Sequence, residues 1–240
     1  FRSDLISESF PGQFRNWFYS LLTMSTALEN SEPFRAVFTY ALVLDEKGEE
    51  MHKSKGNAIW FEDAAERMGV DAMRWVFARQ DPASNINFGF GSADEVRRRF
   101  IIPLWNVYSF FVTYANIDRY DPATRGPAVS ERAELDRWII SELNLLVADV
   151  TRSLEDFEPQ NAARSSEAFV ESLSNWYVRR SRRRFWKSGL LDKPDGGADQ
   201  DKLAAYATLH EVLVTLCRLL APMLPFMTEA MYRNLVSKAN

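Results

Sequence analysis

Apolar residues recur at helical spacing from Ser92 almost to the end of the chain, and this pattern constrains the fold more than any other feature. A first helix is expected from Ser92 towards Ile117, opened by a capping box between Ser92 and Glu95. Further amphipathic helices are expected at about residues 131–156, 161–187, 201–220 and 226–236. Long amphipathic helices with short links bury their apolar faces against one another, so this part of the chain predicts an all-α helical bundle.

Links and core positions follow from the same pattern. Asp118–Ser130 carries proline and glycine and is expected to be a linker, and Lys193–Gly197 is expected to be a flexible surface connection. Trp105, Tyr108 and Phe111 share one face of the first helix, so all three are expected in the core.

The first ninety residues mix helical and strand patterns. Residues 16–28 are expected to form a helix, and Val37–Leu44, rich in β-branched and aromatic residues, a strand. Two short helices are expected at residues 61–68 and 71–79, with Asp71 as the N-cap of the second. The fold class is therefore mixed, with an α/β region before the all-α bundle.

Composition limits the classes of protein. The 240 residues are 46% hydrophobic and 26% charged, as in globular proteins, and a chain of this length is expected to make two domains. The single Cys217 excludes a disulfide framework, and with only two histidines we expect no metal site and no zinc. No signal peptide or membrane-spanning run is evident, so we expect a cytoplasmic protein without a membrane partner. Because the chain begins at Phe1, we expect a fragment of something larger.

The segment Leu42–Asn57 carries the first candidate chemistry. An apolar run ends in the acidic turn Asp45–Gly48, and a loop with Lys53 and Lys55 follows. Lysines on a flexible loop after a strand can neutralise the charge that builds on a departing pyrophosphate. The alternative is a solvated basic turn without function.

A second candidate precedes the helix that Trp17 leads. Glu8, Gln13 and Arg15 cluster there, and a carboxylate and an amide at a helix start can bind ribose hydroxyls and an amino group. The alternative is that these side chains cap the helix.

The third candidate is a basic helix. It carries these cationic residues with no acid among them: Arg179, Arg180, Arg182, Arg183, Arg184 and Lys187. Arginine suits phosphate because its fork is planar and permanently charged, so we expect contact with an RNA backbone. Trp176 and Trp186 could stack on bases or pack the bundle, and Trp176 is expected in the core. The alternative is that the cations cap the helix dipole or pair with acids on neighbouring helices.

The three segments together resemble class I aminoacyl-tRNA synthetases, and among them the isoleucine-specific enzymes. The signature loop of that family reads Lys-Met-Ser-Lys-Ser. Aligned on Met51, this chain places Lys53 and Ser54 on the second lysine and last serine, while Glu50 and His52 replace the first lysine and first serine. The basic helix, and Leu219–Glu229 after it, are similar to segments of the family's anticodon-binding domain.

The resemblance implies a domain division and a set of site residues. Residues 1–91 would be the C-terminal part of a Rossmann-like nucleotide-binding catalytic domain, and residues 92–240 the helical anticodon-binding domain. Lys53 would be catalytic. ATP and the adenylate would contact Glu8, Gln13, Met51, His52, Ser54 and Lys55. The tRNA would contact the six cations of the basic helix, Arg179, Arg180, Arg182, Arg183, Arg184 and Lys187. The family has an aspartate before the glutamine, where this chain has Gly12.

The implied activity is ATP-dependent activation of isoleucine and its transfer to tRNA, with Mg²⁺ accompanying the ATP. A monomer is expected. No histidine precedes His52, so the family's His-Ile-Gly-His signature is missing, and the chain alone is expected to be inactive. Alternatives are a valine or leucine synthetase fragment, a non-catalytic RNA-binding module with a decayed nucleotide site, and a purely structural bundle.

Overall fold

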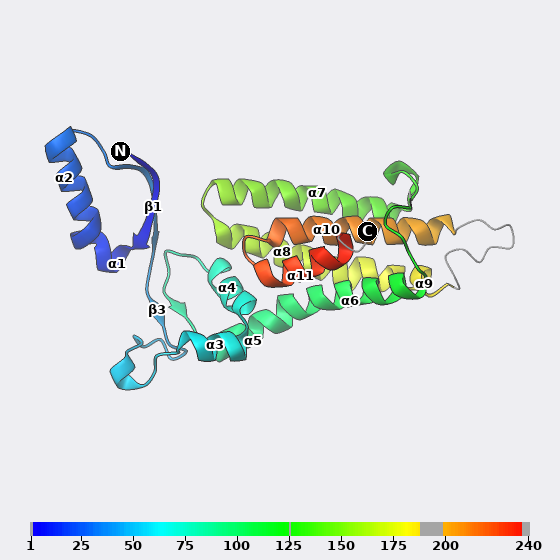
Figure 1. Ribbon diagram of the computed structural model, residues 1–240, viewed down its shortest axis with the longest axis horizontal. Coiled ribbons are helices and arrows are strands. Elements are labelled where there is room, and N and C mark those ends of the chain that lie inside the picture. Colours follow the sequence, from blue (N-terminus) through cyan, green and yellow to red (C-terminus); the bar gives the residue numbers. More distant parts are fainter. Residues whose placement is uncertain (1, 125, 188–198, 237–240) are drawn as a thin grey trace.

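The computed structural model describes residues 2–124, 126–187 and 199–236. Figure 1 shows an elongated molecule with a small α/β unit at one end and helices packed along the remaining length. The link expected at 193–197 lies outside the described residues. The two regions correspond to the mixed fold class that the sequence predicts.

The α/β unit is a strand–helix–strand crossover. Strand β1 (Ser3–Ser9) leads into α1 (Phe10–Gln13), the π-helical turn η1 (Phe14–Phe18) and α2 (Tyr19–Glu29), and β2 (Phe34–Tyr40) returns beside β1. The two strands are parallel, with Ser3 opposite Phe34 and Ser9 opposite Tyr40. Parallel strands require such a crossover, so both carboxyl ends meet at one edge of the sheet.

The strand expected at 37–44 is divided into two pieces. It ends as β2 at Tyr40, and β3 (Val43–Leu44) then pairs in parallel with β4 (Ile86–Asn87) in a second small sheet. The break occurs because the backbone N–H groups of Ala41 and Leu42 donate to the Pro82 carbonyl and the Asn85 side chain.

Two short helices follow the lysine-bearing loop. The 3₁₀ turn η2 (Lys53–Lys55) lies in the loop, and α3 (Phe61–Met68) and α4 (Val70–Ala78) are separated by Gly69, whose φ of 84° favours glycine. The expectation that Asp71 caps α4 is wrong. Its carboxylate instead accepts the backbone N–H groups of Phe226 and Met227, 3.3 and 2.6 Å away, at the start of α11 (Pro225–Val236).

A continuous helical rod crosses from the connecting region into the bundle. It consists of α5 (Phe90–Val96), the π-helical turn η3 (Arg97–Ile101) and α6 (Ile102–Ile117). The helix begins two residues before Ser92, whose hydroxyl donates to the Asn87 carbonyl, so the expected capping box does not form. The expected domain boundary between residues 91 and 92 falls inside α5.

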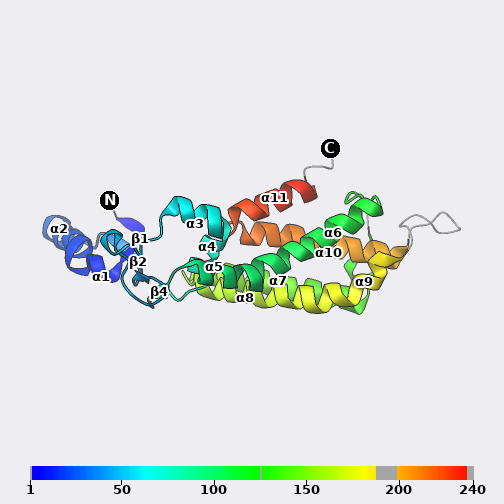
Figure 2. The same ribbon diagram turned by 90° about the horizontal axis from the view of Figure 1, so that it is seen from below.

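The bundle contains the helices expected from the sequence. After the 3₁₀ turn η4 it has these elements: α7 (Glu134–Glu155), α8 (Pro159–Ser172), the π-helical turn η5 (Leu173–Val178), α9 (Arg179–Trp186), α10 (Gln200–Leu220) and α11 (Pro225–Val236). Turn η4 spans Val129–Glu131. Figure 2 shows α8 and α9 as one rod alongside α6 and α10.

One core extends from α3 to α11, so α3–α5 pack as part of the helical region. Trp75 of α4 is fully buried and stacks on Phe100 of η3 with ring centroids 4.0 Å apart. Tyr108 and Phe111 are buried as expected, but Trp105 is 45% exposed. The stripe prediction therefore fails at Trp105.

Two described helices, Phe90–Ile117 and Gln200–Leu220, are long and apolar enough to cross a membrane by length and composition alone. No membrane-spanning run was expected from the sequence alone. In α10 most of the apolar window is buried inside the bundle, which is the pattern of a core helix in a globular fold.

Candidate functional site

Glu8 lies near the carboxyl end of β1, opposite the end of β2. Its Oε1 accepts the Ser9 N–H at 2.8 Å and the Tyr40 hydroxyl at 2.9 Å. These two donors, the Ser9 N–H first, lower the pKa of Glu8, and the same contact raises the pKa of Tyr40. Glu8 is therefore held as a carboxylate at the sheet edge where ligands of parallel sheets bind.

Gln13 acts locally in this structure. It ends α1, and its Oε1 accepts the Trp17 N–H at 3.4 Å, so it serves as the N-cap of η1. The capping alternative thus holds for Gln13, whose amide NH₂ group donates to no described residue. Arg15 is exposed on the next turn.

The lysine loop has an ordered base. Asp45 Oδ1 accepts the N–H groups of Lys47 and Glu49, both at 2.9 Å, and Gly48 adopts a φ of 81° in the turn. Asn57 closes the loop because its Nδ2 donates to Asp45 Oδ2 at 2.9 Å.

Asn57 also fastens the signature segment itself. Its Nδ2 donates to the Glu50 carbonyl at 3.1 Å, and its Oδ1 accepts the His52 N–H at 2.9 Å. The Asn57 amide and the Glu49 N–H lower the pKa of Asp45, the amide being the larger cause. The loop base is therefore a network of short polar contacts and not a packed core.

The tip of the loop presents its cations to solvent. Lys53, Ser54 and Lys55 are exposed, and the Lys53 ammonium lies 4.6 Å from the Trp60 ring centroid. Gly56, with a φ of 71°, ends the 3₁₀ turn. Figure 1 shows this segment beyond the carboxyl end of β1.

The two departures from the family signature contact one another. His52 Nε2 lies 3.3 Å from Glu50 Oε2, and both side chains are about half exposed. Met51 is half-buried beneath them. The replaced positions thus form a local pair and leave Lys53 and Lys55 without an acidic partner among the described residues.

The basic helix divides into two sets of residues. Arg179, Arg180, Arg182 and Arg183 are exposed and make no ion pair with any described residue. Arg184 is the exception, because its side chain is only 13% exposed and binds Asp136 in a two-pronged contact at 2.8 and 2.7 Å.

The Arg184–Asp136 contact is an internal anchor. Asp136 is fully buried in α7 and also accepts the Tyr177 hydroxyl at 2.7 Å. Burial opposes the charge of Arg184, but the hydrogen bonds that it donates to Asp136, and the negative charge of Asp136, outweigh burial and raise the Arg184 pKa. Lys187 is also paired, with Asp201 at 3.1 Å and Asp199 at 3.5 Å. The pairing alternative of the sequence analysis therefore describes Arg184 and Lys187.

Trp176 is not in the core, contrary to the sequence expectation. It is 48% exposed, and the guanidinium of Arg180 lies over its ring, 3.6 Å from the centroid. The π-helical turn η5 explains the difference, because it changes the helical phase and buries Leu173, Tyr177 and Val178 instead.

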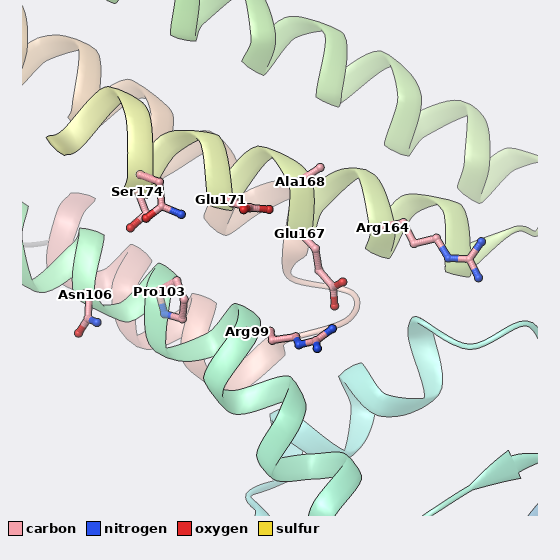
Figure 3. Close-up of a pocket in the computed structure, with 9 residues that line it drawn as sticks. Arg99, Pro103, Asn106, Arg164, Glu167, Ala168, Glu171 and Ser174 are labelled. Atoms are coloured by element: carbon pink, nitrogen blue, oxygen red, sulfur yellow. The ribbon is translucent and has the colours of Figure 1, made fainter. Parts of the chain in front are cut away.

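A groove of about 670 Å³ lies between the η3–α6 rod and the α8–η5 rod. Figure 3 shows Arg99 and Asn106 on one wall and Arg164 and Glu171 on the other. Glu167, on the α8 wall, accepts the Trp75 Nε1–H at 2.9 Å and so joins the groove to the core. The groove carries both signs of charge and contains none of the expected site residues.

Three important residues escaped the sequence analysis. Tyr40 orders Glu8, Asn57 closes the loop, and Asp136 anchors Arg184. Gly56 and Asn57 follow the lysines directly, and because both residue types favour turns, they could have predicted that the loop closes there. Asp136 looked like an ordinary acid in the first turn of a helix. Within the described residues, no group of three or more His, Cys, Asp or Glu side chains could hold a metal ion.

The chain matches two protein families over separate ranges. Residues 1–89 match the family described as tRNA synthetases class I (I, L, M and V). Residues 136–240 match the family described as the anticodon-binding domain of tRNA ligase. The first match covers the α/β unit and the lysine loop, and the second covers the helices from α7 onward.

Curated relatives similar to the chain are isoleucine–tRNA ligases. That of Dehalococcoides mccartyi (strain ATCC BAA-2266) is 48% identical over 100% of this chain and 23% of the relative. That of Deinococcus radiodurans is 44% identical over 97% of this chain and 21% of the relative. That of Thermus thermophilus is 42% identical over 97% of this chain and 22% of the relative. The chain thus spans less than a quarter of the length of these relatives.

Solved structures share the fold at low sequence identity. A leucyl-tRNA synthetase of Agrobacterium radiobacter K84, in a ternary complex with tRNA and LeuAMS, gives a TM-score of 0.69 at 18% identity, covering 97% of this chain and 27% of that one. A methionyl-tRNA synthetase of Mycobacterium tuberculosis, in complex with methionyl-adenylate, gives 0.71 at 18% identity, covering 95% and 43%. The chain therefore belongs to the class I tRNA synthetases and joins part of their catalytic domain to their anticodon-binding domain.

Proposed function

We propose that the protein containing this chain is an isoleucine–tRNA ligase, which activates isoleucine with ATP and transfers it to tRNA. The chain would supply the ATP-contacting lysine loop and a surface for the anticodon arm. The observation that carries the proposal is the 40–48% identity to isoleucine–tRNA ligases over at least 97% of the chain. The leucine- and methionine-specific structures share only 18%.

The α/β unit and the loop support the nucleotide part of the proposal. Lys53 would stabilise negative charge on the ATP phosphates, with Lys55 adding charge beside it. Glu8, ionised and ordered by Tyr40, would accept hydrogen bonds from the adenylate, and the free NH₂ group of Gln13 would donate to it. Met51, His52 and Ser54 would shape the loop around Lys53.

Among the described residues, no group of three or more His, Cys, Asp or Glu side chains could hold a magnesium ion without the help of a substrate. Magnesium would therefore accompany the phosphates of ATP. The contribution of this chain to phosphate chemistry is the exposed positive charge of the loop.

The tRNA part of the proposal uses the exposed set of arginines on α9. Arg179, Arg180, Arg182 and Arg183 are exposed on one end of the bundle and make no ion pair with a described residue, which suits contacts with phosphates. Arg184 would act indirectly by fixing the helix that carries them, and Lys187 would lie at the edge of this surface.

The test is tRNA binding by the 240-residue chain, titrated against salt. We expect wild type to bind an isoleucine tRNA more tightly than a leucine tRNA. The variant Arg179/Arg180/Arg183→Ala should bind more weakly, and its slope of log affinity against log salt should fall by about 0.7 to 0.9 for each phosphate that the variant no longer neutralises.

A matched control removes the same charge elsewhere. Arg67, Arg152 and Arg233 lie on other helices and each pairs with an acid of its own helix. The variant Arg67/Arg152/Arg233→Ala should keep the wild-type salt slope. An equal weakening in both triple variants would mean that only net charge matters, and the arginine surface would be rejected.

One observation favours a second candidate, a non-catalytic RNA-binding module. Glu50 and His52 place an acid–imidazole pair where the family signature has a lysine and a serine. Isoleucine-dependent pyrophosphate exchange by the whole protein separates the candidates. Exchange above background supports the ligase, and tRNA binding without exchange supports the module.

A further inference from the structure

The side chain of Trp176 is unusual for a bundle helix because it is large, apolar and 48% exposed. Its neighbours Tyr177 and Val178 are buried, and the π-helical turn η5 sets this phase. Turns of this kind are frequent at functional sites, since the inserted residue re-aims the side chains beside it. The helix therefore directs an indole outward where a regular α-helix pattern predicts burial.

Arg180 holds the indole in a defined arrangement. Its guanidinium carbon lies 3.6 Å from the Trp176 ring centroid, and no described residue accepts a hydrogen bond from it. A guanidinium stacked on an aromatic ring keeps its N–H edge free, because stacking uses the face of the group. The pair is thus an ordered flat surface, and the N–H groups along the edge of the Arg180 guanidinium donate to no described residue.

The surroundings of this pair are strongly positive. Arg179, Arg182 and Arg183 are exposed within two turns, and none has an acidic partner among the described residues. Arg184, bound to the buried Asp136, fixes the helix beneath them. A rigid aromatic surface inside a cationic field matches a ligand that combines planar rings with phosphates.

We propose that Trp176 and Arg180 form a stacking platform for one unpaired base of the bound RNA. The base lies against the indole–guanidinium pair, and Arg179, Arg182 and Arg183 bind the phosphates on either side. The inference rests on the proposed function and deepens it, because it assigns recognition of an unpaired base to a residue pair that phosphate binding alone does not need.

An RNA base fits this surface better than other occupants. An apolar protein partner would bury four arginines without counter-charge, which is costly. Double-stranded RNA would satisfy the arginines but leave the indole unused, because paired bases are stacked inside the helix. A single-stranded or loop nucleotide satisfies both sets of groups.

The test compares two RNA probes bound by the 240-residue chain. One is a hairpin corresponding to the anticodon arm, with 2-aminopurine at single loop positions, and the other is a blunt duplex of equal charge. We expect wild type to prefer the hairpin and to quench 2-aminopurine at one loop position. Trp176→Ala should weaken hairpin binding about 5- to 100-fold and abolish the quenching, with duplex binding unchanged.

Controls separate stacking from folding. Trp176→Phe keeps an aromatic face and should retain most of the hairpin preference, while Trp105→Ala removes a comparably exposed indole on α6 and should bind as wild type. Helical circular dichroism should be unchanged in all three variants.

The outcomes distinguish the platform from the proposed function. If Trp176→Ala keeps the wild-type hairpin preference and quenching, the platform is wrong and the arginine surface stands. If wild type binds neither probe, the tRNA surface fails and the platform with it. If wild type binds both probes equally, recognition is limited to phosphates and the platform is overturned.

Discussion

The α/β unit and the helical region differ in how they are held together. Among the described residues up to Trp60, only Phe18 is buried, whereas one continuous core runs from Ala64 to Leu235. Burial of apolar area is the main source of stability, so the helical region holds its shape by packing. The α/β unit depends on strand pairing and polar contacts.

The same contrast governs the two sets of cations. Lys53 and Lys55 lie on an exposed loop that Asp45 and Asn57 close by hydrogen bonds. The arginines of α9 lie on a helix fixed by the buried contact between Arg184 and Asp136. A loop held by exposed hydrogen bonds opens at low free energy, whereas a packed helix does not. The molecule thus pairs a movable cationic loop with a fixed cationic helix.

The largest effect on this contrast between the two regions is expected for the variant Asp136→Ala. The change leaves Arg184 without its carboxylate and Tyr177 without its acceptor inside the bundle. Removal of one partner of a buried ion pair costs about 3–5 kcal/mol. Urea denaturation followed by helical circular dichroism should show that decrease.

A double change tests the cause. Asp136→Leu with Arg184→Met removes both charges and should recover most of the stability, since a buried pair adds little net free energy over apolar residues. In the Arg132–Glu211 pair the acid is 44% exposed, so Glu211→Ala should cost less than about 1 kcal/mol. Equal effects of Asp136→Ala and Glu211→Ala would contradict the anchor.

The second test addresses the loop. Asn57→Ala removes the hydrogen bonds to Asp45, Glu50 and His52 but touches no core residue. We expect unchanged unfolding of the helical region and about fivefold faster trypsin cleavage after Lys53 or Lys55, equivalent to about 1 kcal/mol of local stability. Ser54→Ala, on the same loop but without a hydrogen bond to a described residue, should cleave as wild type. A fall in the urea midpoint of the helical region would show that the loop is not independent.

The smallest expected effect is a pH dependence confined to one region. Burial lowers the pKa of His210, although the Leu235 carbonyl partly opposes this. The unfolded chain then binds the proton first, so stability of the bundle should fall as pH drops below the ordinary value of 6.5. His210→Gln should flatten that part of the curve.

The hydrogen bonds of Asp45 at the base of the loop should not weaken in the same window. The pKa of Asp45 lies below its ordinary value of 3.8, so its stabilising carboxylate persists until the pH falls through that lowered pKa. Urea midpoints between pH 8 and 5 report the bundle, and trypsin cleavage between pH 8 and 6.5 reports the loop. A pH-dependent change in loop cleavage beyond that of trypsin itself would contradict the separation.

Much of the helical fold was predictable, because apolar spacing records which face of a helix is buried. The helices α7, α8–α9, α10 and α11 lie where the pattern of the sequence places them. The predictions fail where a contact with a distant segment replaces the local hydrogen bond or strand pairing that the sequence pattern predicts. Ser92 makes no capping box, Asp71 caps α11 instead of its own helix, and the strand expected at 37–44 is divided.

The candidate site was predictable to different degrees. The lysine loop follows from a short contiguous motif, and its acidic turn lies where Asp45–Gly48 predicts it. The sequence shows how many arginines the basic helix carries. It does not show which of them are exposed and which pair with a buried acid. Arg184 differs from Arg183 because it reaches Asp136, which lies 48 residues earlier, and Asp201, which lies 17 residues later.

The sequence by itself determined the helical periods, the turn before the lysines, the family resemblance and the identity of the basic helix. These properties are local, since each depends on residues within a few turns of one another. Tertiary structure alone decided that Trp176 faces solvent, that Arg184 is an anchor and that Asp71 joins α4 to α11. Each of these depends on contacts between distant segments, which form only when the apolar faces have packed and fixed the remaining side chains in place.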